Sequence, residues 1–521
     1  MKNSLSANKS LGRFLSALLV MFSGVLAAQR EGDSFAVGFC DYMFPHGCVE
    51  PYGSAIYKFN EEGLEAIIEP AGLNLNTDYS RAAFSDKQTG DLLFASNGWR
   101  LVNRAGQTLS PKLWFNYYQA PHTLNGEANL LYTQNPLFLP DPGNANRVYL
   151  FYGQYQIWFL PGQGQRWNDM VFTYALLDIP TQTLISQNHI AISDTTAIGG
   201  ISAVRHANGR DWWIVKPGRY LDEYYVGLLN PQGISFEKRI MPEIEHLEHG
   251  RPCTFFNKNG DVFAHFTGFP LLIYKYNFDR CSGDFSNFST VSIADSVWSG
   301  DWMTPALSPD GSKFYFKRSS FPFAEPGTSA LFQYDFETQL ITKLSNIKSG
   351  IQLTPNYKHI IQGSSNFDDP AIDTLIQTYN LIWQPDSAGL NCQFQKNVDS
   401  VLNAPNFIAP SAVVNFRLGK LAGSPCDTIV SSISEQLKVK SVKVFPNPSN
   451  GIVQLQVPEP GQYQLSVFNT TGQRLHTQTL SAHEAIIDFT ALALPSGIYL
   501  LQVQNSITGE MMHGKVVYEK N

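Results

Sequence analysis

One pattern recurs along the middle of this chain: a short apolar run, a polar turn, and a second apolar run. It fills residues 82–98, 201–215, 253–266, 305–316 and 350–361, with turns near 88, 208, 259, 310 and 356. Two apolar runs joined by Asn-Gly, Asp-Gly or a similar turn are a strong signal for a β-hairpin. The later turns recur about every 50 residues, a spacing typical of four-stranded propeller blades. Residues 147–153 belong to a further unit between the turns near 88 and 208.

We therefore predict an all-β chain with a β-propeller-like domain of six to eight blades over residues 29–430. Aromatic residues make up 13% of the chain, which also contains 40 Gly and 30 Pro. Aromatic residues favour strands, and Gly and Pro favour the tight turns between them. A row of stacked β-sandwiches is the alternative architecture.

The N-terminus has the order of a secretory signal peptide. Three basic residues lead into a mostly apolar run at residues 14–28, which closes with small residues. A basic lead, an apolar core and a small-residue cleavage site are the parts of such a signal. We predict a signal peptide at residues 1–28, cleaved between Ala28 and Gln29, with a membrane anchor as the alternative. No later segment is long and apolar enough to predict a transmembrane helix in the mature chain.

Six cysteines follow the predicted cleavage site: Cys40, Cys48, Cys253, Cys281, Cys392 and Cys426. An even number of cysteines in an exported chain predicts disulfides. Short loops lose the least entropy on closure, so neighbours in sequence are the favoured partners. The predicted pairs are Cys40–Cys48, Cys253–Cys281 and Cys392–Cys426. A zinc site is the alternative, although the chain has no Cys-x-x-Cys pair.

The sequence carries no familiar catalytic motif. It has no Gly-x-Ser-x-Gly elbow, no His-Glu-x-x-His and no phosphate-binding loop. The net charge is −7 and no basic run is present, which argues against nucleic-acid binding. We therefore predict no catalytic residue, no metal and no cofactor, and the ligand-binding residues stay unknown.

The densest group of ionisable residues lies at 243–251 and includes His246 and His249, with His265 further along. Imidazoles and carboxylates at this density could bind a transition metal or supply a general acid and base. A charged, solvated loop between blades explains the same residues and is the favoured interpretation. Acidic residues at 295–301 and 366–369 lack the spacing of a calcium loop.

Aromatic residues crowd the first half of the central region. They are Trp99, Trp114, Tyr117, Tyr118, Trp158, Trp167, Trp212, Trp213, Tyr220, Tyr224 and Tyr225. Exposed rings beside amides would hold sugars by stacking and hydrogen bonding. Rings that fill the interfaces between blades explain the same composition, and this second interpretation is favoured.

Three motifs mark the last eighty residues. A Val-Phe-Pro-Asn-Pro-Ser-Asn-Gly run ends at residue 451, a Val-Phe-Asn-Thr-Thr-Gly-Gln run ends at 473, and a Leu-Pro-Ser-Gly-Ile-Tyr-Leu-Leu-Gln-Val run ends at 503. Alternating apolar and polar residues between them predict short strands with frequent turns, as in a small β-sandwich at residues 441–521. A polar linker at residues 431–440 precedes it.

These motifs resemble the type A C-terminal sorting domain of the type IX secretion system of Bacteroidetes-type bacteria. The residues that carry the resemblance are Phe445, Pro446, Asn447, Pro448, Gly451, Gly472, Pro495, Ser496, Gly497 and Tyr499. The resemblance implies that the export machinery recognises this sandwich. It also implies that the protein is secreted or attached to the outer cell surface after outer-membrane translocation.

The central region is more loosely similar to uncharacterised secreted propeller-like proteins, at residues 84–98, 204–213 and 403–407. That resemblance implies no activity. Two functions fit the sequence. The favoured one is a non-enzymatic binding or structural module that holds a glycan or a surface protein. The alternative is a secreted hydrolase or lyase that acts on polysaccharide or peptide at the propeller channel.

Overall fold

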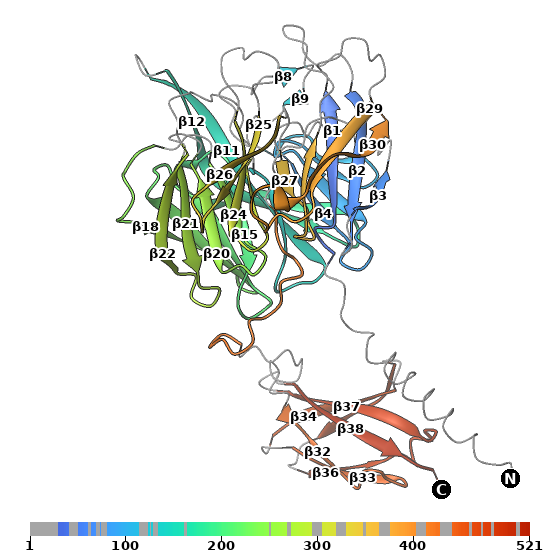
Figure 1. Cartoon of the computed structure of the whole chain (residues 1–521). Coiled ribbons are helices and arrows are strands. Elements are labelled where there is room, and N and C mark those ends of the chain that lie inside the picture. Colours follow the sequence, from blue (N-terminus) through green and yellow to red (C-terminus); the bar gives the residue numbers. More distant parts are fainter. Residues whose placement is uncertain are drawn as a thin grey trace, which may run out of the picture. The chain divides into compact units, whose positions relative to one another are not determined.

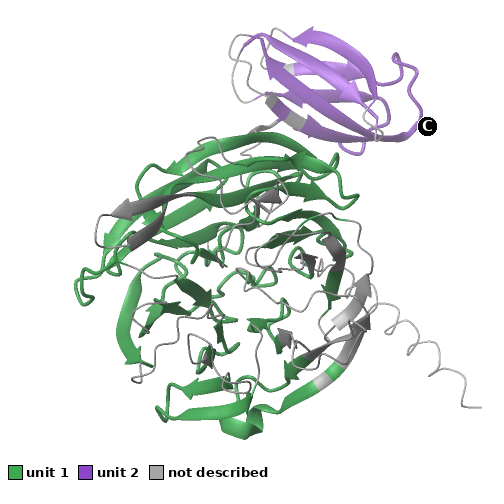
Figure 2. Cartoon of the chain, turned by 90° about the horizontal axis from the view of Figure 1, so that it is seen from above, with its two compact units in different colours: residues 1–428 green, residues 429–521 purple. Residues whose placement is uncertain are grey.

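The computed structural model divides the chain into two compact units, residues 1–428 and residues 429–521 (Figures 1 and 2). It describes residues 30–40, 51–60, 64–68, 73, 75, 81–113, 123–124, 127–128, 134–160, 164–248, 252–267, 272–293, 305–318, 330–346, 351–363, 376–402, 413–427, 440–457, 461–469, 473–480, 484–506 and 511–520. The predicted cleavage site at Ala28 and Gln29 lies outside these residues. No helix in the described ranges is long and apolar enough to cross a membrane.

Within its described residues, unit 1 contains seven antiparallel sheets of three to five strands. The first four are β1 (Ser34–Cys40), β2 (Pro51–Phe59) and β3 (Leu64–Ile68); β4 (Ala82–Ser85), β5 (Leu92–Ser96), β6 (Leu101–Asn103) and β7 (Thr108–Ser110); β10 (Leu137–Pro140), β11 (Arg147–Leu160), β12 (Gly164–Asp178) and β13 (Thr183–Ile192), joined by β14 (Thr196–Ala197); and β15 (Ser202–Arg205), β16 (Trp212–Pro217), β17 (Glu223–Asn230) and β18 (Gly233–Ile240).

The remaining three are β19 (Cys253–Phe256), β20 (Val262–Phe266), β21 (Leu272–Phe278) and β22 (Phe285–Ser292); β23 (Ala306–Leu307), β24 (Lys313–Arg318), β25 (Ala330–Asp335) and β26 (Ile341–Asn346); and β27 (Ile351–Leu353), β28 (Ile360–Gly363), β29 (Ile376–Ile382) and β30 (Phe394–Leu402). Strands β8 (Thr123–Leu124) and β9 (Glu127–Ala128) pair separately, and η1 (Gly389–Cys392) is one 3₁₀ turn.

The seven sheets stand in a ring around a central axis (Figure 2), and the first strands of most successive sheets are in contact: β1 with β4, β4 with β10, β15 with β19, β19 with β23 and β23 with β27. Consecutive antiparallel sheets in a ring are the blades of a β-propeller. The prediction of an all-β propeller-like domain is confirmed, and the seven sheets fall within the expected six to eight blades.

All five predicted hairpins are present, each as the first two strands of a blade: β4–β5, β15–β16, β19–β20, β23–β24 and β27–β28. Four of the turns place a Gly at the same point with φ between 73° and 78°: Gly90, Gly209, Gly260 and Gly311. A positive φ costs Gly little because it has no Cβ. The fifth turn places Tyr357 there, at φ 55°. The expected segment 147–153 lies in β11.

Burial follows position within a blade. The strands nearest the axis, such as β5, β15 and β16, are buried along their whole length. The outermost strands, such as β18 and β22, alternate half-buried and exposed residues. Aromatic rings fill the space between blades: Tyr224, Phe263, Tyr276, Phe278 and Phe285 pack with centroids 5.2–6.3 Å apart. Burying a side chain such as Phe contributes roughly 1.5–3 kcal/mol, so these interfaces stabilise the ring.

Unit 2 is a β-sandwich. One sheet has the order β31 (Lys440–Ser441), β38 (Met511–Tyr518), β37 (Gly497–Asn505), β34 (Tyr463–Phe468) and β35 (Arg474–Leu480). The other has the order β32 (Lys443–Phe445), β33 (Ile452–Gln456) and β36 (Glu484–Asp488). Alternate residues of β33, β34 and β37 are buried and form one apolar core, as the sequence pattern predicts for a sandwich.

The predicted disulfide pairs need correction. Cys281 bonds to Cys426, 145 residues away, so the predicted pairs Cys253–Cys281 and Cys392–Cys426 are wrong. Cys253 and Cys392 are both buried. The entropy argument for short loops fails here because the folded chain brings Cys426 back across the ring. Cys48 and the side chain of Cys40 lie outside the described residues, so the Cys40–Cys48 pair stays a prediction.

Candidate functional sites

Residues 413–427, here called the strap, cross the side of the propeller that carries the first turn of each blade. Two strap carbonyls accept hydrogen bonds: Val413 from Tyr357 Oη at 3.0 Å and Gly419 from Arg280 Nη2 at 2.5 Å. Two strap donors bond to blade carbonyls: Asn415 Nδ2 to Lys258 and the Leu421 N–H to Ala207, both at 2.8 Å. These partners come from three different blades. The strap therefore ties the blades together on this side, and the disulfide at Cys426 holds its end.

An aromatic residue and an arginine anchor the middle of the strap. The Phe416 ring packs 5.5 Å from Trp212 and 6.3 Å from Phe84. Arg417 Nη2 lies 2.5 Å from Asp33 Oδ1, and Asp33 also accepts a hydrogen bond from Arg30. Burial raises the pKa of Asp33 although both arginines favour its charged form. The carboxylate is held by two cations, so the strap docks onto the first blade by charge as well as by packing.

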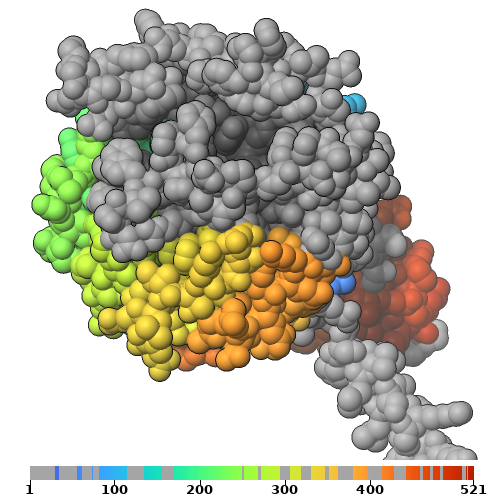
Figure 3. Space-filling view, turned by 45° about the horizontal axis from the view of Figure 1, so that its top comes forward, coloured from blue at the N-terminus to red at the C-terminus, as the bar shows by residue number. Residues whose placement is uncertain are grey.

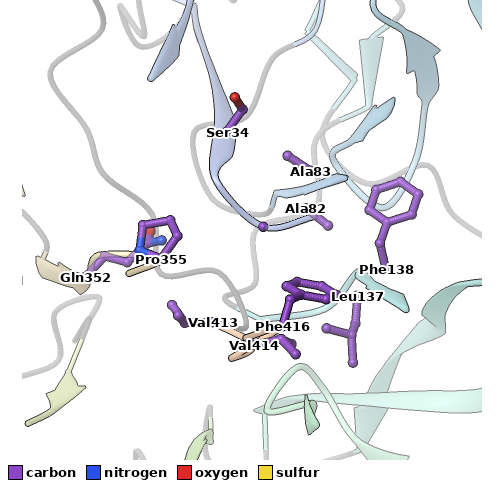
Figure 4. A pocket seen from close by; sticks show the side chains of 11 residues that line it. Ser34, Ala82, Ala83, Leu137, Phe138, Gln352, Pro355, Val413, Val414 and Phe416 are labelled. Atoms are coloured by element: carbon purple, nitrogen blue, oxygen red, sulfur yellow. The ribbon is translucent and has the colours of Figure 1, made fainter. Parts of the chain in front are cut away.

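A small pocket remains beside the strap (Figure 4). Its lining residues are Gly32, Ser34, Ala82, Ala83, Leu137, Phe138, Gln352, Pro355, Val413, Val414 and Phe416. Its volume is about 40 Å³, room for a few water molecules, whereas ligand sites typically measure roughly 300–1,000 Å³. The strap thus contributes apolar side chains, Val413, Val414 and Phe416, to a pocket that is too small for a typical ligand.

The described part of the ionisable cluster, residues 243–248, lies at the surface in the segment that follows β18. His246 Nδ1 donates to both carboxylate oxygens of Asp222, at 2.9 and 3.0 Å, and the imidazole stacks on the Tyr220 ring at 3.9 Å. Arg219 Nη2 donates to Glu248 Oε1 at 2.7 Å, which raises the pKa of the arginine. These contacts tie the segment before 249 to the β16–β17 connection, as the solvated-loop interpretation expects. His249 lies outside the described residues.

His265, which the sequence grouped with this cluster, lies elsewhere. It is fully buried on β20, and its Nδ1 forms a hydrogen bond with the hydroxyl of Tyr224. Burial raises the pKa of Tyr224 well above its ordinary value. Among the residues that the structure describes, no group of three or more His, Cys, Asp or Glu side chains is arranged to hold a metal ion.

The most deeply buried ion pair was not found in the sequence. Lys216 Nζ donates to Asp169 Oδ2 at 2.8 Å and to the carbonyls of Ala197 and Gly199 at 2.6 Å, and both charged side chains are completely buried. Burial lowers the pKa of Lys216 and raises that of Asp169, while each partner opposes the shift of the other. Gly153 leaves room for the carboxylate, since a Cβ there would lie 2.1 Å from Asp169. This pair joins two blades.

Most of the described aromatic candidates are buried. Trp99, Trp212, Trp213, Tyr224 and Tyr225 are all at most 9% exposed, which supports the interpretation that they fill blade interfaces. The side chains of Trp114, Tyr117, Tyr118, Trp158 and Trp167 lie outside the described residues.

The exposed tryptophan in the described ranges is Trp383, which the sequence analysis missed. Its side chain follows β29 and is 38% exposed. It stands outside the aromatic-rich half of the chain, so composition gave no signal. The neighbouring amides Gln384, Gln393 and Gln395 were the available clue.

In unit 2, the first sorting motif binds alongside β38, C-terminal to the residues of β38 that pair with β31. Asn447 Nδ2 donates to the Lys515 carbonyl and Asn447 Oδ1 accepts from the Val517 N–H, both at 2.8 Å. Ser449 continues this pairing: its N–H donates to the Val517 carbonyl, and its carbonyl accepts from the Glu519 N–H. The motif therefore lies beside β38 like an additional strand. At one position the Asn447 side-chain amide makes the hydrogen bonds that a backbone residue would otherwise make.

The other motif residues close the same end of the sandwich. Tyr499 Oη donates to the Pro495 carbonyl at 2.6 Å, and Ser496 Oγ accepts from the Lys520 N–H at 2.8 Å. A Cβ on Gly451 would approach Thr490 Cγ2 to 2.7 Å, which explains the glycine. Pro446 and Pro448 flank Asn447 in the same loop.

The middle motif lies along the same row of the sheet. Phe468 pairs with Leu500, and Leu500 pairs with Lys515, so all three motifs meet at one end of the five-stranded sheet. Gly497 begins β37 opposite Tyr518. Gly472 lies outside the described residues.

Residues 443–519 match the family described as "Secretion system C-terminal sorting domain". This segment is a type IX sorting domain. It directs the protein out of the cell and to attachment at the cell surface, through interaction with the type IX machinery. The match covers the C-terminal unit and leaves the activity of the propeller open. No curated protein matches the chain.

Several solved structures are similar to the chain. A putative 6-phosphogluconolactonase from Bacteroides uniformis is 14% identical, with 71% of this chain and 97% of that chain covered and a TM-score of 0.38. A second from Bacteroides fragilis is 12% identical, with 73% and 97% covered and a TM-score of 0.40. PorZ, a surface component of the type IX secretion system of Porphyromonas gingivalis, is 11% identical, with 90% and 84% covered and a TM-score of 0.22. At these values the similarities carry no argument about function.

Proposed function

We propose that unit 1 is a binding module displayed at the cell surface, with no hydrolytic activity at the strap side of its channel. The sorting domain delivers the chain to the surface. The observation that carries the proposal is the strap, whose Val413, Val414 and Phe416 line a pocket of only about 40 Å³ between the first strands of several blades. A polysaccharide or peptide chain could not enter there without displacing them.

The charges beside the strap also support a scaffold role. Asp33 is held by Arg30 and Arg417, and Arg205 Nη2 donates to the Phe416 carbonyl at 3.2 Å. Burial lowers the pKa of Arg205 to about 10, so it stays charged at neutral pH. A general acid or base must be able to change its protonation state near the working pH, whereas Arg205 stays charged and Asp33 is engaged by two arginines. They stabilise the closed ring, which leaves ligand recognition to exposed side chains on the blades.

The test is to incubate the purified full chain with a glycan array and with a cell-envelope protein fraction, and to analyse every bound partner by mass spectrometry. Binding that leaves the partner intact supports the proposal. Shortened or unsaturated glycans, or cleaved peptides, would overturn it in favour of a secreted hydrolase or lyase. Failure to bind either kind of partner would also overturn it.

A further inference from the structure

The loop that joins β29 and β30, residues 383–393, folds back onto the neighbouring blade. The buried side chain of Gln333 on β25 donates to the Ser387 carbonyl at 2.8 Å and accepts from the Gly389 N–H at 2.6 Å. Tyr315 Oη donates to the Pro385 carbonyl at 2.7 Å. Leaving such buried polar groups without partners is unfavourable, so these hydrogen bonds hold the loop firmly. The two blades lie side by side in the yellow and orange surface of Figure 3.

Trp383 begins this loop and presents a ring whose orientation is locked. Its indole N–H donates to Gln395 Oε1 at 2.9 Å. The His359 ring packs against it edge-on, with centroids 5.0 Å apart and planes at 73°. The Trp383 carbonyl also accepts a hydrogen bond from His359 Nδ1 at 3.1 Å. With its polar atom already bonded and its ring held at 38% exposure, the indole presents apolar surface to solvent.

Exposed amide residues neighbour Trp383, and one of them, Gln395, bonds to its indole. Gln384 follows Trp383 directly, and Gln393 and Gln395 stand on the returning side of the hairpin. The Trp383 N–H pairs with the Gln393 carbonyl across it, which keeps the two sides together. A fixed aromatic surface with amides beside it matches the two faces of a sugar, whose C–H groups stack on rings and whose hydroxyls bond to amides. Tryptophan is among the residue types that are enriched at the energetic centres of binding surfaces.

We propose that Trp383, with Gln384 and Gln395, is a carbohydrate-binding platform on the last blade of the propeller. The proposal rests on the proposed binding function and names its ligand class and its site. Exposed leucines occur on the same flank, Leu390 at 74% and Leu340 at 64% exposure. They make a protein partner the alternative outcome of the test.

The experiment measures glycan-array binding, and then the Kd for the strongest glycan, with the full chain and three variants. Trp383→Ala should weaken binding at least about tenfold, as expected for a dominant aromatic contact. Trp383→Phe keeps a ring and should retain part of the affinity. Leu390→Ala, on the same loop, is the matched control and should bind like wild type. Thermal unfolding of each variant checks that the propeller is intact.

Equal glycan binding by wild type and Trp383→Ala would overturn the site while leaving the binding function standing. Binding to envelope proteins that Leu390→Ala abolishes, without any glycan binding, would replace the carbohydrate with a protein partner. A wild-type chain that binds neither partner would remove the proposed function itself, so the two failures can be told apart.

Discussion

The propeller and the sorting sandwich are both built from antiparallel strands, but the contacts that hold them together differ in how far apart the contacting residues lie in the sequence. In unit 2, short motifs contain the residues that do the structural work: Asn447 and Ser449 bond to β38, and Ser496 and Tyr499 close the same end. In unit 1, the decisive contacts join residues far apart, such as Asp33 with Arg417 and Cys281 with Cys426. The structural contacts of the sorting domain can therefore be predicted from short sequence motifs. The contacts that close the propeller join residues far apart in the chain and cannot be predicted in this way.

The largest expected effect probes the long-range side of this comparison. Lys216→Met leaves the Asp169 carboxylate buried without its cation, and removal of one partner of a buried pair costs about 3–5 kcal/mol. Chemical denaturation of the full chain should show a loss of this size in the transition of unit 1 alone. The double variant Asp169→Leu with Lys216→Met should recover much of it. An unchanged transition for Lys216→Met would show that the pair does not hold the two blades together.

The disulfide is the next test of ring closure. Replacing both Cys281 and Cys426 by Ser removes a crosslink with a sequence separation of 145 residues, which should destabilise unit 1 by about 2–5 kcal/mol. The strap should also become sensitive to proteolysis, measured by mass spectrometry of the fragments after brief digestion. Leu421→Ala, at an exposed position of the strap, is the control. Equal protease resistance in the double variant would mean that packing of Phe416 alone secures the strap.

A smaller effect is expected in the sorting domain. Asn447→Ala removes two hydrogen bonds to β38, each with a net contribution of about 0.5–1.5 kcal/mol. Unit 2 should unfold at lower denaturant and surface delivery of the chain should fall, as measured by immunoblots of cell-surface and medium fractions. Asn450→Ala, an exposed neighbour in the same motif, should behave like wild type. Normal delivery with a destabilised unit 2 would separate recognition of the motif from its structural role.

The smallest effect concerns pH. Burial, with the nearby Asp310 carboxylate, raises the pKa of Asp386 to about 6, and the Asp310 N–H donates to Asp386 Oδ1 at 3.0 Å. Lys258 is the cation that opposes the shift. Because the folded pKa is raised, protonated Asp386 favours folding, and this contribution is full below about pH 4 and lost as pH rises through 6. Asp386 is exposed, so solvent screening reduces the effect to about 1 kcal/mol or less.

Asp386→Asn should remove this pH dependence, giving a unit 1 whose stability changes less between pH 5 and 7 than that of wild type. Denaturation curves at pH 5, 6 and 7 measure the difference. The neighbouring Ser387→Ala variant should keep the wild-type slope. Identical slopes in Asp386→Asn and wild type would contradict the assignment.

Local signals explain what could be predicted. Each hairpin turn needs a residue with positive φ, and Gly90, Gly209, Gly260 and Gly311 supply it within a few residues of two apolar runs. The turn and both apolar runs of each hairpin lie within one short segment, so the sequence predicted the strand pairs at their correct positions. Only the fifth turn, with Tyr357 at this point, departs from the glycine rule, and its Pro-Asn sequence still marked it.

Contacts between distant residues explain what was missed. The predicted cysteine pairs were wrong because loop entropy favours neighbours only when the fold does not bring distant cysteines together, and the strap does so for Cys426. Trp383 was missed because the exposure of a ring depends on what packs over it, whereas most of the aromatic candidates whose side chains are described are buried.

Sequence was thus sufficient for the all-β class, the hairpin unit and the sorting motifs, because turns, alternation and motif spacing are properties of neighbouring residues. The closure of the ring by the strap, the buried Asp169–Lys216 pair and the orientation of Trp383 were decided by tertiary structure. The physical reason is that burial, charge pairing and exposure are set by residues that meet only after the blades have packed together.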